Sequence, residues 1–164
     1  MATNKITFWQ LLQNNSIEIP IVQRDYAQGR AGKEYLRKNF LTSLKQALDG
    51  ETLKLDFVYG SVENNTLQPL DGQQRLTTLW LLHWYIALFA GKYEETFNIL
   101  SKFSYETRIS SREFIQNLCN PENFTSFDKK DVVKFIKDAT WYYSAWNQDP
   151  TISSMLRMIK GTNI

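Results

Sequence analysis

The sequence predicts an α+β fold, in which a small mixed sheet with helices continues into a helical region. Its 164 residues are 43% hydrophobic and 14% aromatic, which is enough apolar material for a packed core. Up to Gly91 the pattern reads helix, strand, helix, strand, strand, helix, and beyond it helical patterns dominate. We therefore expect an α/β unit at residues 1–91 and a helical extension at 92–164, the start of a longer helical region.

The first third of the chain contains two predicted helices and one strand. Residues 7–13 carry apolar side chains at helical spacing, with Thr7 as the N-cap. Residues 17–22 alternate in polarity and contain Pro20, which predicts a short edge strand. Residues 25–33 are typical of a loop, and helical periodicity then continues from Tyr35 until Asp49-Gly50 ends it.

A hairpin and a long apolar helix are expected next. Residues 53–62 and 67–70 resemble strands, and Asn64-Asn65 between them predicts the turn. The helix expected at 73–90 holds the most apolar stretch of the chain, but this stretch is shorter than the roughly 20 residues that span a membrane.

In the second half we expect helices at 94–101, 111–118, 131–146 and 151–159, and an extended segment at 103–108. Ser110 or Ser111 is the expected cap of the second helix.

Charge and residue counts exclude several classes of protein. A net charge of +2 does not indicate an extensive nucleic-acid or membrane surface, although Arg24, Arg30, Lys33, Arg37 and Lys38 form a local basic patch. One histidine cannot build a His-rich metal site. One cysteine forms no internal disulfide, and the N-terminus lacks a signal-peptide pattern, so we expect a cytoplasmic protein without membrane partners.

The densest polar cluster is Asp71-Gly72-Gln73-Gln74-Arg75-Leu76-Thr77-Thr78, between a predicted strand and a helix start. Free backbone N–H groups and the helix dipole favour an anion there. In that interpretation Gly72 admits a phosphate to the backbone, Arg75 contributes its guanidinium, and Thr77 and Thr78 offer hydroxyls. The alternative, at even odds from spacing alone, is structural: Asp71 caps the helix and pairs with Arg75 at i, i+4.

Other candidate motifs have weaker support. Gln23 and Arg24 follow a strand and precede a glycine-bearing loop, where ligand contacts are common, but a solvated strand end is the default interpretation. The stretch Gly29 to Lys33 lacks the spacing of a phosphate-binding loop. We expect His83 in the core.

For the aromatic and arginine clusters in the second half, we also favour a structural role over a role in ligand binding. Trp141, Tyr142, Tyr143 and Trp146 are expected to be core residues rather than a base-stacking platform. Contact of Arg108 or Arg112 with a phosphate is the less favoured alternative.

Three motifs in this order resemble a known family: residues 19–26 (IPIVQRDY), 55–62 (LDFVYGSV) and 69–79 (PLDGQQRLTTL). They are similar to the N-terminal domain of GmrSD-type, modification-dependent (type IV) restriction proteins, whose fold is related to ParB and sulfiredoxin. The resemblance covers residues 7–90 through these motifs and continues more loosely to 156.

The resemblance implies a nucleotide site in which each residue has a role. Asp71 would hold Mg²⁺ or orient water, and Gly72, Gln73 and Gln74 would contact phosphates or position water. Arg75 would neutralise developing charge. The remaining contacts would come from Gln23, Arg24, Thr77 and Thr78.

We therefore expect a nucleotide-binding regulatory domain of an anti-phage restriction system. If the domain also hydrolyses the NTP, the catalytic residues would be Asp71, Gln74 and Arg75. DNA cleavage would belong to a separate nuclease domain, with DNA as a partner of the complete protein or complex. The alternative is a non-catalytic module that binds DNA or a protein partner through the same pocket.

Overall fold

The structure is a computed structural model that describes residues 5–20, 26, 30–55 and 58–162. Helices and strands are mixed along this part of the chain, which confirms the predicted α+β class with a helical C-terminal part. The helices are α1 (Phe8–Asn14), α2 (Glu34–Leu48), α3 (Gln73–Phe89), α4 (Tyr93–Leu100), α5 (Ile109–Leu118), α6 (Val132–Asp138) and α7 (Pro150–Gly161). The strands are β1 (Ser16–Ile19), β2 (Tyr59–Glu63), β3 (Thr66–Asp71) and β4 (Phe103–Tyr105).

The four strands form one mixed sheet in the order β2-β3-β1-β4. Strand β1 pairs in parallel with β3 on one side and with β4 on the other, so it is an inner strand. The predicted edge position of this strand is therefore wrong. Proline is tolerated because β1 ends at Ile19, and Pro20 follows the ladder instead of interrupting it.

The predicted hairpin is confirmed, with a later start. Asn64 and Asn65 both have positive φ, 49° and 61°, as a type I′ turn requires, and β2 pairs antiparallel with β3 across them. Residues 53–55 have no regular structure and β2 starts at Tyr59. All of β2 is exposed, whereas β3 buries alternate residues.

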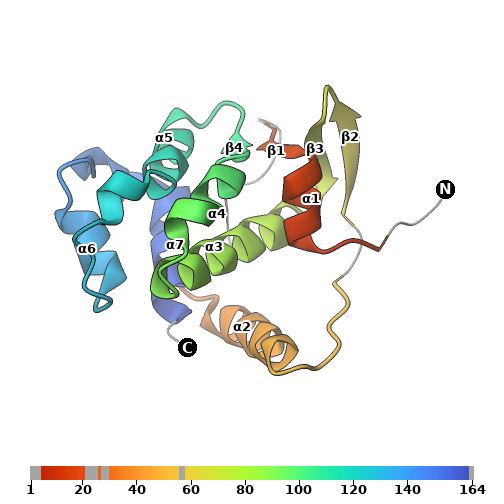
Figure 1. Ribbon diagram of the computed structural model, residues 1–164, viewed down its shortest axis with the longest axis horizontal. Coiled ribbons are helices and arrows are strands. Elements are labelled where there is room, and N and C mark those ends of the chain that lie inside the picture. Colours follow the sequence, from red (N-terminus) through yellow and green to blue (C-terminus); the bar gives the residue numbers. More distant parts are fainter. Residues whose placement is uncertain (1–4, 21–25, 27–29, 56–57, 163–164) are drawn as a thin grey trace.

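Helix α3 passes through the centre of the molecule, with its start next to the sheet and with α4 and α7 at its other end (Figure 1). It packs against α4 and α7, and its residues are buried on almost every side, as its nearly unbroken apolar sequence predicts. Two of its tryptophans, Trp80 and Trp84, are fully buried and donate hydrogen bonds to the carbonyls of Leu100 and Leu118.

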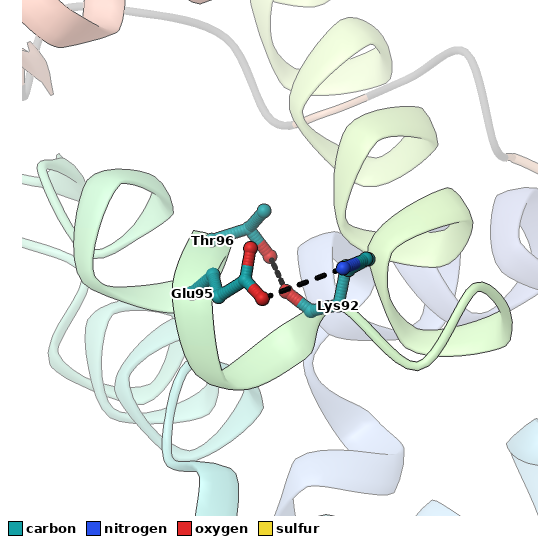
Figure 2. Close-up of polar contacts among 3 residues, drawn as sticks. All are labelled: Lys92, Glu95 and Thr96. Atoms are coloured by element: carbon teal, nitrogen blue, oxygen red, sulfur yellow. Dashed lines mark hydrogen bonds and ion pairs between the residues drawn. The ribbon is translucent and has the colours of Figure 1, made fainter.

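A tight turn joins α3 to α4. Gly91 adopts a left-handed φ of 70°, and Lys92 precedes the first turn of α4. Figure 2 shows that turn: the Thr96 hydroxyl donates to the Lys92 carbonyl at 2.7 Å, and the Lys92 ammonium lies 3.5 Å from the Glu95 carboxylate. Because both charged side chains are exposed, this ion pair contributes little to stability.

The helix predicted at 131–146 is wrong in extent. Helix α6 ends at Asp138, and a 3₁₀ turn, η2 (Ser144–Gln148), follows after a gap. The intervening residues include a β-branched residue and aromatics, which are poor helix formers. Trp141, Tyr142 and Trp146 turn inward and surround Phe114 of α5, with ring centroids 5.6–6.5 Å away.

The serine caps predicted for α5 are also wrong, because Arg108 holds the N-cap position and Ser110 lies inside the helix. The Ser110 hydroxyl instead donates to the carboxylate of Asp149. Asp149 also accepts from the backbone N–H groups of Thr151 and Ile152, at 2.8 and 3.0 Å, and so caps α7. These bonds join the starts of α5 and α7.

The sheet and the core both extend across residues 91–93. Strand β4, from the second half, completes the sheet, and one hydrophobic cluster includes Leu12 and Ile17 as well as Phe114 and Ile152. In the described ranges, no helix is long and apolar enough to cross a membrane.

Candidate functional site

The Asp71–Thr78 motif lies where β3 leads into α3. Asp71 is the last residue of the strand, and Gly72 is the N-cap of the helix in a left-handed conformation, with φ 89°. The prediction that Asp71 caps the helix is therefore wrong. Because Gly72 has no side chain, no side-chain hydrogen bond from this residue caps the start of α3. One residue, Gly72, separates the strand from the helix, and glycine adopts its left-handed conformation at low energetic cost.

Gly72 also permits a close approach of two side chains. A Cβ atom at this position would lie 2.7 Å from Val58 Cγ2 and 3.3 Å from Arg75 Nη2. The space beside the glycine is therefore already occupied by the segment before β2 and by the guanidinium. Because Gly72 has no side chain, the Arg75 guanidinium can lie beside the start of α3.

Arg75 and Asp71 form the i, i+4 ion pair that the structural alternative predicted, with Nη2 and Oδ2 3.8 Å apart. The Asp71 side chain is 60% exposed and the Arg75 side chain 23% exposed. The carboxylate is thus open to solvent beside a largely covered guanidinium, and both charged groups lie at the strand–helix junction.

The two glutamines sit in the first turn of α3 and both are half-buried. Gln73 Oε1 is buried and has no hydrogen-bond partner in the part of the chain that the structure describes. Such an orphaned acceptor costs about 1–3 kcal/mol, so a hydrogen-bond donor or a cation at this oxygen would stabilise the helix start. The oxygen of a glutamine amide can accept a hydrogen bond from a water or a ligand hydroxyl or can bind a cation. Its N–H₂ group can donate a hydrogen bond to an anion.

Thr77 and Thr78 are 2% and 1% exposed. Their hydroxyls donate to the carbonyls of Gln73 and Gln74, at 2.9 and 3.0 Å, and contact the hydroxyls of Tyr105 and Tyr26, at 3.2 and 2.7 Å. Because each threonine proton is used within the helix, the tyrosines donate to the threonines. The threonines therefore connect the helix start to β4 and to the segment containing Tyr26.

Gln23 and Arg24 lie outside the described residues, so their predicted contact with the motif stays a prediction. Tyr26, from the same sequence motif, is described and buried, and burial raises the pKa of its phenol, which keeps it neutral. Sequence reasoning missed the structural roles of Tyr26, Tyr105 and Val58. Tyr26 and Val58 lie inside two of the three motifs, 19–26 and 55–62, whereas Tyr105 lies outside all three.

The metal expectation rests on one carboxylate. Among the described residues there is no group of three or more His, Cys, Asp or Glu side chains that could hold a metal ion. Mg²⁺ commonly binds through one or two carboxylates together with phosphate oxygens and water. Asp71 therefore fits Mg²⁺ only as a shared ligand with a bound phosphate chain.

The remaining candidates have structural roles. Arg108 donates to the Thr151 hydroxyl at 3.2 Å, and Arg112 donates to the Glu106 carbonyl at the same distance. Trp146 is buried and Trp141 and Tyr142 are partly buried against the core, as predicted, whereas Tyr143 is exposed. Burial raises the pKa of the Cys119 thiol, so the thiol is kept protonated.

His83 is half-buried, and its ring packs on Phe8 and Trp9 at centroid distances of 5.0 and 6.1 Å. Its Nδ1–H donates to the Leu79 carbonyl at 2.7 Å. Burial lowers the pKa of His83 below its ordinary value of 6.5, although the hydrogen bond to Leu79 acts in the opposite direction. The imidazole joins α1 to α3 in its neutral form.

This depressed pKa predicts a loss of stability in mild acid. As the pH falls through 6.5, the unfolded chain takes up a proton at His83 before the folded chain does, so the free energy of unfolding decreases. We expect His83→Phe, which keeps an aromatic ring, to flatten this decrease. Urea unfolding at pH 5, 6 and 7 measures the effect, and identical pH profiles for the two proteins would contradict it.

The chain is therefore an α+β domain whose candidate site lies at a strand–helix junction and consists of a glycine cap, two glutamines and an arginine. Within that class the chain belongs to the family of GmrSD restriction endonuclease N-terminal domains, whose sequence model matches residues 8–163. The resemblance noted from the three motifs is thereby confirmed, and the chain is a restriction-system domain. Comparisons with curated proteins and with solved structures find no significant match.

Proposed function

We propose that the chain is a nucleotide-binding regulatory domain of a restriction system, with its nucleotide site at the start of α3. The observation that carries the proposal is the buried, unpartnered Gln73 Oε1 beside Gly72 and the Arg75 guanidinium. The first turn of α3 also directs its backbone N–H groups and the positive end of its dipole toward this point. A phosphate chain that carries Mg²⁺ matches this set of groups: the guanidinium and the backbone N–H groups would face phosphate oxygens, and the Gln73 oxygen would face the cation, its water or a ligand hydroxyl.

Each residue of the motif has a role in the proposal. The exposed Asp71 carboxylate would hold Mg²⁺ together with the phosphates, and the ion would supply positive charge to the phosphate oxygens. Gln73 and Gln74 contact the ligand through their amide groups, and Gln23 and Arg24, which lie outside the described residues, are proposed as the remaining contacts. Thr77 and Thr78, whose hydroxyls have partners inside the protein, position the helix start instead of touching the ligand.

Hydrolysis is the further step of the proposal. Gln74 orients a water molecule toward the terminal phosphorus, and Arg75 balances the charge that develops as the phosphoanhydride bond breaks. Asp71 would hold the Mg²⁺ ion that accompanies the phosphates. DNA cleavage is then the work of a separate nuclease domain, which nucleotide binding or turnover in this domain would license.

Thermal unfolding with ATP, GTP, CTP or UTP, with and without Mg²⁺, tests the proposal. A ligand at 100 times its Kd stabilises the folded state by about 2.7 kcal/mol, or about 5–10 °C in Tm for a domain of this size. We expect such a shift for the wild type and its loss in Arg75→Ala. Lys92→Ala is the control, since it removes one cation from an exposed ion pair beyond the opposite end of α3.

The outcomes separate the alternatives. A nucleotide shift that Arg75→Ala retains would place the site elsewhere, and no shift with any nucleotide would contradict nucleotide binding by this chain. A shift without phosphate release would leave binding and remove the enzyme. Stabilisation by DNA alone, lost in Arg75→Ala, would favour the non-catalytic binding module.

A further inference from the structure

A second polar feature lies away from the α3 motif, in the groove between α2 and the C-terminal end of α7. Its cavity has a volume of about 390 Å³. Figure 1 shows α2 set apart at the lower edge of the molecule, near the C-terminus. The groove is lined by Glu34, Arg37, Lys38, Leu41, Thr42 and Lys45 of α2 and by Gly161 of α7; we call it the α2–α7 groove.

The basic side chains of the groove follow one side of α2. Lys38 and Lys45 are seven residues apart, which corresponds to about 10 Å along a helix and to nearly the same face, and Arg37 starts the row about 12 Å from Lys45 and roughly 80° around the helix. The cations therefore form a row that is longer than a single phosphate group.

Arg37 is the innermost of these cations. A Cβ atom at Gly161 would lie 3.4 Å from Arg37 Nε, so the guanidinium packs closely against the last turn of α7. Arg37 Nη1 is buried and has no hydrogen-bond partner within the described ranges. A guanidinium in this position lacks an acceptor, and an anion in the groove would supply one.

One acid faces these cations. The Glu34 carboxylate accepts a hydrogen bond from the Gly32 N–H at 3.0 Å. Backbone hydrogen bonds from its own N–H and from Gly32 lower the pKa of Glu34, with smaller contributions from Arg37 and Arg157. Glu34 thus neutralises only part of the charge of the three cations on α2, and Arg157 of α7 acts on the same carboxylate.

We propose that the α2–α7 groove binds the phosphodiester backbone of a nucleic acid. A row of cations about 12 Å long matches successive phosphates, and an open groove admits a chain that continues past both ends. The Arg37 fork and the Thr42 hydroxyl provide hydrogen bonds to phosphate oxygens. This site is separate from the nucleotide site proposed at the start of α3 and does not depend on it.

Binding of a fluorescent 20-base-pair DNA duplex by the full chain, measured by anisotropy at several salt concentrations, tests this inference. Three phosphate contacts predict a slope of about −2.7 in log affinity against log salt, so the affinity should fall about 40-fold from 50 to 200 mM. In Lys38→Gln/Lys45→Gln the magnitude of the slope should fall by about two. Arg37→Gln should weaken binding as well.

Lys92→Gln is the control, because it removes one exposed lysine on α4 and should leave the affinity within twofold of the wild type. Both lysines of the double variant are exposed, so the test holds even if Arg37→Gln disturbs folding. Equal DNA binding by the wild type and the double variant, or no binding by the wild type at 50 mM salt, would overturn the inference. So would a groove variant that loses only the thermal shift with nucleotides, since the groove would then be a nucleotide site.

Discussion

Replacing Trp84 by alanine is expected to lower the free energy of unfolding by about 3–5 kcal/mol, a large part of the stability of a domain this size. Trp84 is fully buried in α3, and its ring lies 6.3 Å from Phe97 and 5.5 Å from Phe124. Its Nε1–H donates to the Leu118 carbonyl at 2.7 Å, near the end of α5. The substitution would leave a cavity at a point where three segments meet and would free a carbonyl.

Urea unfolding followed by circular dichroism measures this loss, and Trp84→Phe separates its components. Phenylalanine keeps part of the ring contacts but cannot donate to Leu118, so we expect an intermediate loss of about 1–3 kcal/mol. Ile86→Ala, on the same helix and 39% exposed, should cost about 1 kcal/mol or less. A loss for Trp84→Ala no larger than that for Ile86→Ala would contradict the central position of Trp84.

Local signals in the sequence predicted the elements that local forces form. The Thr7 cap, the Asn64-Asn65 turn and the unbroken apolar run of α3 each act within a few residues, and all three appear in the structure. The Thr7 hydroxyl even completes a capping box with Gln10, whose side chain bonds back to the Thr7 N–H at 2.9 Å.

Long-range pairing could not be predicted in the same way. Strand β1 is an inner strand because the three residues of β4, more than 80 positions later, pair with it in parallel. No local pattern around Pro20 contains that information. Likewise, the end of α6 depends on Phe114, whose contacts draw Trp141 and Tyr142 toward the core instead of along a helix.

The candidate site shows the same division. Spacing predicted the Asp71–Arg75 pair because i, i+4 residues are neighbours on any helix. The contacts of Gly72 with Val58 and of Thr78 with Tyr26 join segments 14 or more positions apart, so only the folded chain reveals them. These contacts give Thr77 and Thr78 a positioning role that the motif alone did not indicate.

Gly72→Ala is expected to destabilise the domain by about 2–4 kcal/mol and to abolish nucleotide binding at the start of α3. A left-handed φ costs a non-glycine residue about 1–2 kcal/mol, and the new Cβ would also lie 2.7 Å from Val58 Cγ2. Relief of that contact requires Val58 or the helix start to move. Arg75 Nη2, 3.3 Å from the same Cβ, would then leave the position in which it could meet a phosphate.

Gly91→Ala at the other end of α3 separates backbone strain from this close approach. Gly91 has a similar left-handed φ of 70°, but no described atom lies within 4 Å of an added Cβ. It should therefore lose only about 1–2 kcal/mol in urea unfolding and keep its thermal shift with nucleotides. Equal losses of stability in the two variants, together with unchanged nucleotide shifts, would show that the contact of Gly72 with Val58 and Arg75 has no part in the site. A larger loss in Gly72→Ala, accompanied by loss of the nucleotide shift, would tie the shape of this junction directly to binding.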